Sequence, residues 1–157
     1  MIIEKWEYAD SPPMELLLSA DPSEEHIGKY LVEGQCYVAR EANETLGVFV
    51  LLPLNKQEME IVNIAVSVEE QGKGIGKSLV KRAIQIAKEQ GYSFLKVGTG
   101  NSSVDQLAYY QKCGFRIVGV DIDYFTRNYA HEIVENGIVC RDMVLLEMNL
   151  AIGGTCK

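Results

Sequence analysis

Gln71-Gly72-Lys73-Gly74-Ile75-Gly76-Lys77-Ser78 occupies the middle of the chain, between an apolar run typical of a strand and a segment with strong helical periodicity. Three alternate glycines let the backbone turn sharply and bring its N–H groups close to a ligand. The helix that follows adds the positive end of its dipole at the same place. The stretch therefore predicts a binding site for a ligand that carries phosphate groups.

Length and composition favour one acidic globular unit. The chain has 157 residues, of which 47% are hydrophobic, and this is enough for one well-filled core. We expect a single domain over residues 1–157, with residues 151–157 as a frayed tail. The net charge is -7, and no window is dense in Lys or Arg. This balance argues against a nucleic-acid partner and fits either simple solubility or a cationic substrate.

The chain shows no signal for a membrane or a metal. Charged residues begin at Glu4, and no apolar run approaches the roughly 20 residues that a bilayer demands. We therefore expect a cytoplasmic protein with no membrane partner. The four cysteines are scattered, with no Cys-x-x-Cys pair and no histidine at ligand spacing. This pattern predicts reduced thiols in the core, without a metal site or a disulfide framework.

Alternation and periodicity predict the elements on both sides of the glycine stretch. In the first half we expect strands over Ile2–Tyr8, Gln35–Glu41 and Leu46–Leu52, and from Glu58 or Met59 to Val68. We also expect one helix beginning at Pro12 and Pro13, and another from about Pro22 or Ser23 to Leu31 that ends near Gly34. In the second half we expect a helix from Ile75 to a stop at Gly91, a strand over Phe94–Val97, a helix over Val104–Lys112, a strand over Phe115–Val120, and a closing strand from Cys140 or Asp142 to Leu150. Ser102 or Ser103 is expected to cap the helix at Val104, Gly114 to end it, and 121–136 to be irregular.

Two familiar phosphate motifs fail on spacing. A P-loop, G-x-x-x-x-G-K-[ST], would end at Ser78 but requires glycine where the chain has Gln71. A dinucleotide fingerprint, G-x-G-x-x-G, would begin at Gly72 but requires glycine where the chain has Lys77. Gln71-x-x-Gly74-x-Gly76 fits a third pattern at every position. It resembles the Q/R-x-x-G-x-G/A motif of the GCN5-related N-acetyltransferase (GNAT) superfamily.

The resemblance extends downstream through a second, separate motif. Asn101 together with Tyr110-Gln111-Lys112-Cys113-Gly114-Phe115 is similar to the family's N...Y-x-K-x-G-F signature. It implies an α/β (mixed α+β) GNAT-like domain, with a mostly antiparallel sheet of about six to seven strands, a splayed central strand pair and about four flanking helices. The implied activity is transfer of an acetyl group from acetyl-CoA directly to a primary amine, through a tetrahedral intermediate. The amine would belong to a small cationic molecule or to a protein or peptide.

The same resemblance implies which residues hold acetyl-CoA. The glycine-stretch amides would bind the pyrophosphate, and the backbone of the central strand would pair with the pantetheine arm. The implied cofactor residues are Ile64, Ala65, Val66, Gln71, Gly72, Lys73, Gly74, Ile75, Gly76, Lys77, Ser78, Asn101, Tyr110 and Lys112. For Asn101, capping of the helix at Val104 is the alternative.

Two residues are implied in the chemistry. Tyr110 occupies the family position of the general acid, and a phenol stays protonated at neutral pH. Glu60 falls on the position of the catalytic glutamate in the histone acetyltransferase branch. Its alternative is a glutamate at the exposed start of a strand. Relatives that acetylate ribosomal-protein N-termini carry a catalytic glutamate where this chain has Lys96, which argues against that substrate.

The sequence gives fewer indications of where the acceptor amine binds. Tyr124, Tyr129 and His131 lie in an acidic and aromatic segment that would hold a cationic amine, with an ordinary surface loop as the alternative. A monomer and a homodimer both remain open. Two other functions remain open as well: a non-catalytic module that binds or senses coenzyme A, and a nucleotide-binding protein of the P-loop type.

Overall fold

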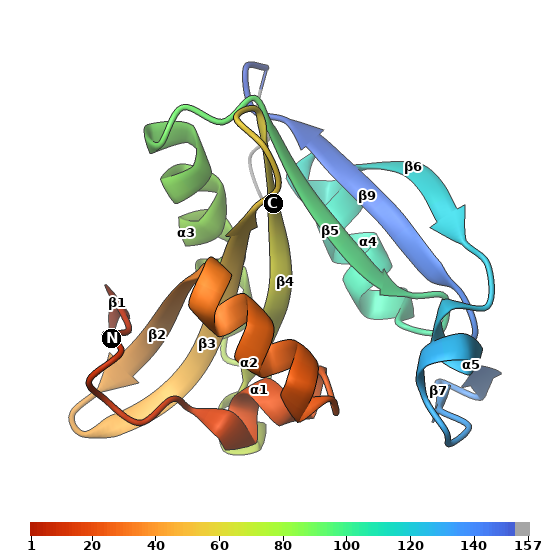
Figure 1. Cartoon of the computed structure of the whole chain (residues 1–157), viewed down its shortest axis with the longest axis horizontal. Coiled ribbons are helices and arrows are strands. Elements are labelled where there is room, and N and C mark those ends of the chain that lie inside the picture. The colour runs from red at the N-terminus through yellow and green to blue at the C-terminus, as the bar shows by residue number, and fades with distance from the viewer. Residues whose placement is uncertain (153–157) are drawn as a thin grey trace. The chain divides into compact units, whose positions relative to one another are not determined.

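Four strands from the first half of the chain pair side by side. A computed structural model describes residues 1–152, in which Met1–Tyr92 form one compact unit and the residues from Ser93 onward form a second. The first unit contains β1 (Ile2–Lys5), α1 (Met14–Ala20), α2 (Glu24–Glu33), β2 (Gln35–Glu41), β3 (Glu44–Pro53), β4 (Glu58–Val66), a short 3₁₀ turn η1 (Val68–Glu70) and α3 (Ile75–Glu89). Its strands pair antiparallel in the order β1-β2-β3-β4 (Figure 1).

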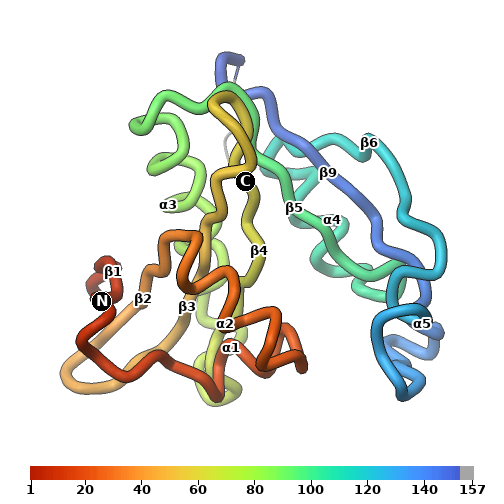
Figure 2. Tube along the Cα trace, viewed as in Figure 1, coloured from red at the N-terminus to blue at the C-terminus, as the bar shows by residue number. Residues whose placement is uncertain are grey.

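The two faces of these strands are covered by different helices. Val48 and Val50 of β3 belong to a buried cluster that includes Leu17 of α1 and Ile27 of α2. Gly47, which directly precedes Val48 on β3, faces the opposite side. A Cβ built on Gly47 would lie 3.0 Å from the Leu79 side chain of α3. Alternation along β3 therefore puts α1 and α2 on one face and α3 on the other (Figure 2).

The second unit is built around β9. It contains β5 (Phe94–Gly100), α4 (Val104–Cys113), β6 (Arg116–Asp121), α5 (Tyr124–Asn128), β7 (Val134–Glu135), β8 (Ile138–Val139) and β9 (Met143–Asn149). Both β5 and β6 pair antiparallel with β9, so β5 and β6 run parallel to each other and are connected through α4. The central β9 buries Leu146 and Met148 on one of its faces.

Most expected elements are confirmed, with shifts at their ends. α2 begins after Ser23, whose hydroxyl accepts a hydrogen bond from the His26 amide at 3.2 Å, and it ends at Gly34. Among residues 1–152 the two units contain seven main strands, mostly antiparallel, as expected, and five α-helices where about four were expected. The expected single domain and the expected splay of the central strands stay predictions. Of the expected frayed tail, 153–157 lie outside the described residues.

The segment expected to be irregular contains regular structure. α5 has only five residues, too few to show helical periodicity, and it begins after Asp123, which has φ +61°. β7 and β8 form a two-stranded ribbon around Asn136 and Gly137, both with positive φ. Asn-Gly is the strongest short signal for such a hairpin, so this ribbon was available from the sequence.

No helix in the described part of the chain is both long enough and apolar enough to span a lipid bilayer.

Candidate functional site

The glycine stretch turns through two left-handed residues. β4 ends at Val66, η1 follows, and then Gly72 and Gly74 take φ +83° and +87°. L-residues with a side chain rarely adopt this conformation, so glycine is required at both positions. A Cβ built on either residue would meet no protein atom within 4 Å. Apart from the adjacent residues of the chain, no side chain therefore lies within 4 Å of these two positions.

α3 presents an uncapped N-terminus at the end of this turn. Gly74 is the N-cap and supplies no side-chain cap, and the first turn contains no acidic residue. The Ser78 amide donates to the Gly74 carbonyl at 3.2 Å, so the amides of residues 75–77 precede the first helical hydrogen bond. N–H groups at the positive end of a 15-residue helix suit an anion. The predicted phosphate-binding residues therefore fit a pyrophosphate group.

Side chains around the turn brace it. Gln71 Nε2 donates to the Val66 carbonyl at 3.2 Å and so ties the turn to the end of β4. Lys73 Nζ lies 3.1 Å from Glu70 Oε2 and is exposed to solvent. Lys73 was predicted to be a cofactor residue, and the structure gives it a carboxylate partner in the same turn. The backbone amides of the turn are therefore the main candidates for binding an anion.

β4 contains one residue more than its partner strand requires. Val50 of β3 pairs with Asn63. The next residue of β3, Leu51, pairs with Ile61, so Val62 has no partner of its own. This is a β-bulge, and it shifts the alternation of side chains by one residue between the two halves of β4.

The bulge brings Glu60 and Asn63 to the same face. Val62 and Ala65 both pack against the core cluster of α1 and α2, although residues three apart on a regular strand lie on opposite faces. Leu52, which pairs with Glu60, also packs against this cluster. Asn63 donates to a carbonyl of α1. Glu60, the predicted base, therefore lies on the face of β4 that α1 and α2 cover.

The predicted cofactor strand residues are placed by the same register. Ile64, Ala65 and Val66 pair with Phe49, Val48 and Gly47 of β3, in that order. All three are half-buried. Backbone groups of an antiparallel strand point alternately to its two sides, so part of their N–H and C=O groups point away from β3.

Tyr110 is held by the turn that ends α4. Gly114 takes φ +106°, its amide donates to the Gln111 carbonyl at 3.1 Å, and the Phe115 amide donates to the Tyr110 carbonyl at 3.0 Å. This is a Schellman motif, which needs glycine at the left-handed position. It turns the Phe115 ring edge-on to the Tyr110 ring, with centroids 5.5 Å apart. The Y-x-K-x-G-F pattern therefore has a local physical cause.

The Tyr110 side chain is almost completely buried, with 3% of its surface exposed. Burial, and then the neighbouring Tyr109, raise the pKa of the Tyr110 phenol above its ordinary value. The phenol therefore stays protonated over the whole physiological pH range. Lys112, two residues further along α4, is exposed to solvent.

Asn101 connects segments of the second unit. Its Oδ1 accepts from the amides of Arg141 and Asp142, at 2.8 and 3.0 Å, and its Nδ2 donates to the Val139 carbonyl at 3.0 Å. These contacts hold the approach to β9 rather than the N-terminus of α4. The alternative role of Asn101 as a helix cap is therefore not what the contacts show, and its role toward the cofactor stays a prediction.

A serine hydroxyl was expected to cap the N-terminus of α4, and this prediction is wrong. Ser103 is the N-cap residue, but its hydroxyl makes no cap bond. Instead the hydroxyls of Ser102 and Ser103 both donate to Glu135 Oε1, at 3.1 and 3.2 Å. The carboxylate of the β7-β8 ribbon competes successfully because it is a charged acceptor.

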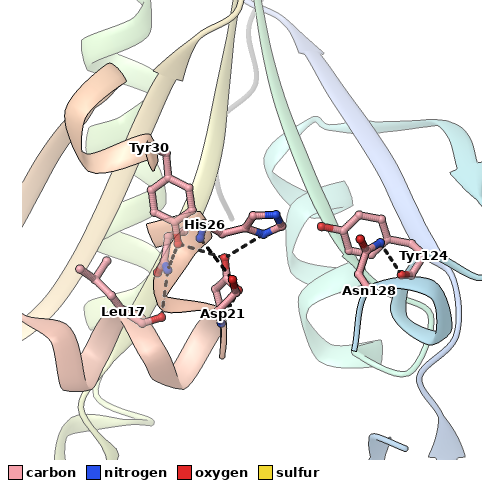
Figure 3. A network of polar contacts seen from close by, with 8 residues as sticks. Leu17, Asp21, His26, Tyr30, Tyr124 and Asn128 are labelled. Atoms are coloured by element: carbon pink, nitrogen blue, oxygen red, sulfur yellow. Dashed lines mark hydrogen bonds and ion pairs between the residues drawn. The ribbon is translucent and has the colours of Figure 1, made fainter. Parts of the chain in front are cut away.

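The predicted acceptor residues lie on and after α5. The rings of Phe125 and Tyr129 stack with centroids 5.8 Å apart, and Tyr124 packs edge-on to Phe125 at 5.1 Å. Asn128 Nδ2 donates to the Tyr124 carbonyl at 2.7 Å (Figure 3). His131 is exposed and lies beyond this aromatic group. The structure thus brings Tyr124 and Tyr129 together around Phe125.

The cysteines differ from one another. Cys36 and Cys140 are free and buried, and burial raises the pKa of both thiols, that of Cys36 to about 12. Cys113 is fully buried and disulfide-bonded, so the expectation of reduced thiols is wrong for this residue. None of the three is therefore a reactive thiolate at neutral pH.

Three residues of interest were missed from the sequence. Asn63 is one of three polar or charged residues buried in the described chain. Tyr30 and Asp21 complete a hydrogen-bonded chain with it, and Figure 3 shows the Tyr30 and Asp21 side chains. An asparagine inside the apolar run Ile61–Val66 was the available signal, because buried polar groups need partners. Nothing local connects it to Tyr30 or Asp21.

Comparisons with known proteins agree on one family. The model of the acetyltransferase (GNAT) family matches residues 3–115. The uncharacterized N-acetyltransferase YvbK of Bacillus subtilis is 51% identical over 148 residues, which cover 94% of this chain and 96% of that protein. A solved IAA acetyltransferase from Bacillus cereus has a TM-score of 0.90 and 54% identity, covering 94% of this chain and 98% of the other. A GNAT family acetyltransferase from Elizabethkingia anophelis, solved with acetyl-CoA bound, has a TM-score of 0.92 and 46% identity over 94% of this chain and 97% of its own.

Proposed function

Because this chain belongs to the GNAT family and is an acetyl-CoA-dependent N-acetyltransferase, we propose that it acetylates a primary amine directly, on a small cationic molecule or a peptide. The observation that carries the proposal is the left-handed glycine turn before the uncapped α3 helix. This turn would hold the pyrophosphate through the amides of residues 75–77. Acetyl-CoA, when bound, supplies an activated thioester carbonyl.

Glu60 is proposed as the base. The reaction forms a C–N bond and breaks a C–S bond, so the amine must lose a proton and the leaving thiolate must gain one. Glu60 lies on the half-buried face of β4 beneath α1 and α2, where a carboxylate can take the proton from the amine directly or through one water. Backbone N–H groups of β4 beyond the bulge are the proposed donors to the oxyanion that forms on the carbonyl.

Tyr110 is proposed as the acid. Its phenol is protonated at every physiological pH because burial raises its pKa, so the proton is always present. The Schellman turn and the Phe115 ring hold its position. A thiol has a pKa of about 8.5 in water, which is below that of the phenol. Transfer of the Tyr110 proton to the leaving thiolate is therefore favourable only where the thiolate is itself poorly solvated.

Direct transfer fits the cysteines better than an acyl-cysteine relay. Cys113, three residues from Tyr110, is disulfide-bonded. Cys36 and Cys140 are buried, and burial raises the pKa of both. A relay requires a thiolate that solvent and substrate can reach.

The proposal is tested by a thiol-release screen with acetyl-CoA and a panel of monoamines, polyamines, aminoglycosides, amino acids and lysine peptides. The panel also includes IAA, the compound in the name of the similar B. cereus protein. The buried Cys36 and Cys140 do not compete with free CoA for the thiol reagent in the folded protein. Release with at least one amine is expected. Binding of acetyl-CoA without release from any amine would favour the module that only senses coenzyme A.

The role of Tyr110 is tested on the best acceptor from that screen. Tyr110→Phe is expected to lower kcat by roughly 100-fold or more, because a positioned general acid contributes about that much. Tyr109→Phe is the matched control, since it removes a phenol from the adjacent position of the same helix. Equal turnover of Tyr110→Phe and wild type across the pH range would contradict the assignment.

A further inference from the structure

A chain of hydrogen bonds runs from the cofactor strand to the junction of α1 and α2. Asn63 is 4% exposed, and its Nδ2 donates to the Leu17 carbonyl of α1 at 3.0 Å and to Tyr30 Oη of α2 at 2.7 Å. Both N–H groups of the amide are therefore used, and this fixes which way the amide faces. A single side chain of β4 thus fastens both helices.

Tyr30 carries the chain onward to a carboxylate. Its hydroxyl donates to Asp21 Oδ2 at 3.2 Å, and Asp21 Oδ1 accepts from the Ser23 amide at 3.1 Å. Asp21 is the C-cap of α1, and His26 Nδ1 lies 3.9 Å from its Oδ2. The Asp21 side chain is 13% exposed, so part of its surface still reaches solvent.

The arrangement costs stability. Asn63 Oδ1 is buried and accepts no hydrogen bond from any residue that the structure describes. An unsatisfied buried acceptor lowers the stability of the folded state, and a leucine of similar volume would avoid that cost. The benefit of asparagine at this position is therefore positional, since its two donated bonds set where α1 and α2 lie above β4.

The hydrogen-bonded chain begins on the same face of β4 as the proposed base. Asn63 shares its face of β4 with Glu60, because the bulge at Val62 shifts the alternation. α1 and α2 cover that face, so the Asp21 carboxylate lies at the junction of the two helices above the strand that carries the proposed base.

We propose that Tyr30 and Asn63 are positioning residues that orient the Asp21 carboxylate to bind a positively charged group of the acceptor. The inference rests on the proposed function and narrows its substrate class to amines that carry a second cationic group. A fixed carboxylate with little remaining hydration attracts such a group more strongly than an exposed, mobile one. Positioning by the hydrogen bond of Tyr30 is what separates Asp21 from the many exposed acidic residues of this chain.

The test uses acetyl-CoA with a diamine and a monoamine of similar length. Asp21→Asn is expected to raise KM for the diamine about tenfold and to leave KM for the monoamine nearly unchanged, because it removes one charged hydrogen-bonding partner. Tyr30→Phe is expected to raise the diamine KM several-fold in the same selective way. The Kd for CoA is expected to stay within about twofold of wild type in both variants.

Two designs separate positioning from a general structural effect. Tyr37→Phe is the matched control, because Tyr37 is also a buried tyrosine of the same unit whose hydroxyl donates to a side chain, Gln35, at 2.9 Å. It is expected to leave both KM values unchanged. In the double variant, Tyr30→Phe is expected to add little to Asp21→Asn, since both act through one contact.

The outcomes are distinguishable from those of the proposed function. If wild type releases thiol with neither amine nor any other in the panel, the proposed function fails and this inference fails with it. If wild type turns over the diamine and Tyr30→Phe behaves like Tyr37→Phe, the inference alone fails. A diamine KM that Asp21→Asn leaves unchanged, or a fully additive double variant, also overturns the inference.

Discussion

Tyr110 combines three properties that are set by different parts of the chain. Helical periodicity places it on α4, the left-handed Gly114 turns the chain back, and Phe115 then packs against its ring. Burial follows from this packing, and the raised pKa follows from burial. A single change at Gly114 would therefore disturb the position and the acidity of the phenol together, because both depend on the same turn.

The raised pKa of Tyr110 predicts a loss of stability at alkaline pH. In the unfolded chain a tyrosine ionises near pH 10, whereas the buried phenol keeps its proton to higher pH. Below about pH 10 both states are protonated and the full stability is present. Above it the unfolded state alone releases the proton, so the free energy of unfolding falls as pH rises.

Urea unfolding at about pH 8 and about pH 11 measures this effect. Tyr110→Phe is expected to lose less stability between the two pH values than wild type does. Tyr8→Phe is the control, because Tyr8 is 66% exposed, and it is expected to lose as much as wild type. An equal loss in Tyr110→Phe and wild type would show that Tyr110 ionises in the folded state as it does in the unfolded one.

At the level of elements, the N-terminus of α3 is the proposed binding site for the pyrophosphate of acetyl-CoA. Gly74→Ala is expected to weaken CoA binding about tenfold. An alanine at φ +87° is strained by roughly 1–2 kcal/mol, and relief of the strain redirects the amides of the first helical turn. The built Cβ meets no protein atom within 4 Å, so a clash inside the protein does not explain a loss of binding. Isothermal calorimetry with CoA gives the Kd.

Gly91 provides a close control at the other end of the same helix. It has φ +84°, and a Cβ built on it also meets nothing within 4 Å. Gly91→Ala is therefore expected to cost about the same stability and to leave the Kd for CoA unchanged. If both variants bind CoA equally well, the glycine turn is not the phosphate site.

The elements show what local sequence determines here. Ser23, Gly34, Gly91 and Gly114 delimit helices through capping and left-handed turns, which act over a few residues, and these boundaries were predictable. The glycine stretch was predictable for the same reason. The Ser103 cap was not, because Glu135, 32 residues away, takes the hydroxyl. Competition between a local and a distant partner leaves no pattern near Ser103.

The residues of the candidate site divide in the same way, into those placed by local turns and those placed by contacts distant in the sequence. The positions of Gln71 to Ser78 and of Tyr110 depend on local turns, so motif spacing located them. The common face of Glu60 and Asn63 depends on a bulge in β4, whose register is decided by pairing with β3. A regular strand would put these two residues on opposite faces. The chain from Asn63 through Tyr30 to Asp21 joins three elements and was therefore invisible to spacing.

At the scale of the whole molecule, net charge predicts how the rate responds to salt. The chain carries -7 at neutral pH. A dication is attracted over a longer range and more strongly than a monocation, and salt screens this attraction, with a Debye length of about 10 Å at 0.1 M. With acetyl-CoA saturating, kcat/KM for a diamine is expected to fall several-fold between about 0.02 and 0.5 M NaCl.

The monoamine used at the same salt concentrations is the control, and its kcat/KM is expected to fall less. Steady-state thiol release provides both values. An equal salt dependence for the two amines would mean that the net negative charge of this protein does not attract the dication more strongly than the monocation. That outcome would leave the local carboxylate at Asp21 as the only proposed source of preference for dications.

The extra residue of β4 also bears on how this gene tolerates insertions and deletions. Loss of the single codon for Val62 would remove the bulge and restore an even alternation along the strand. The pairs Val50–Asn63, Leu51–Ile61 and Leu52–Glu60 would then follow one another without a break, and Glu60 and Asn63, now two residues apart, would both stay on the side of α1 and α2. The reading frame of the gene would stay intact, and the folded strand would lose only the packing of the Val62 side chain against the core cluster.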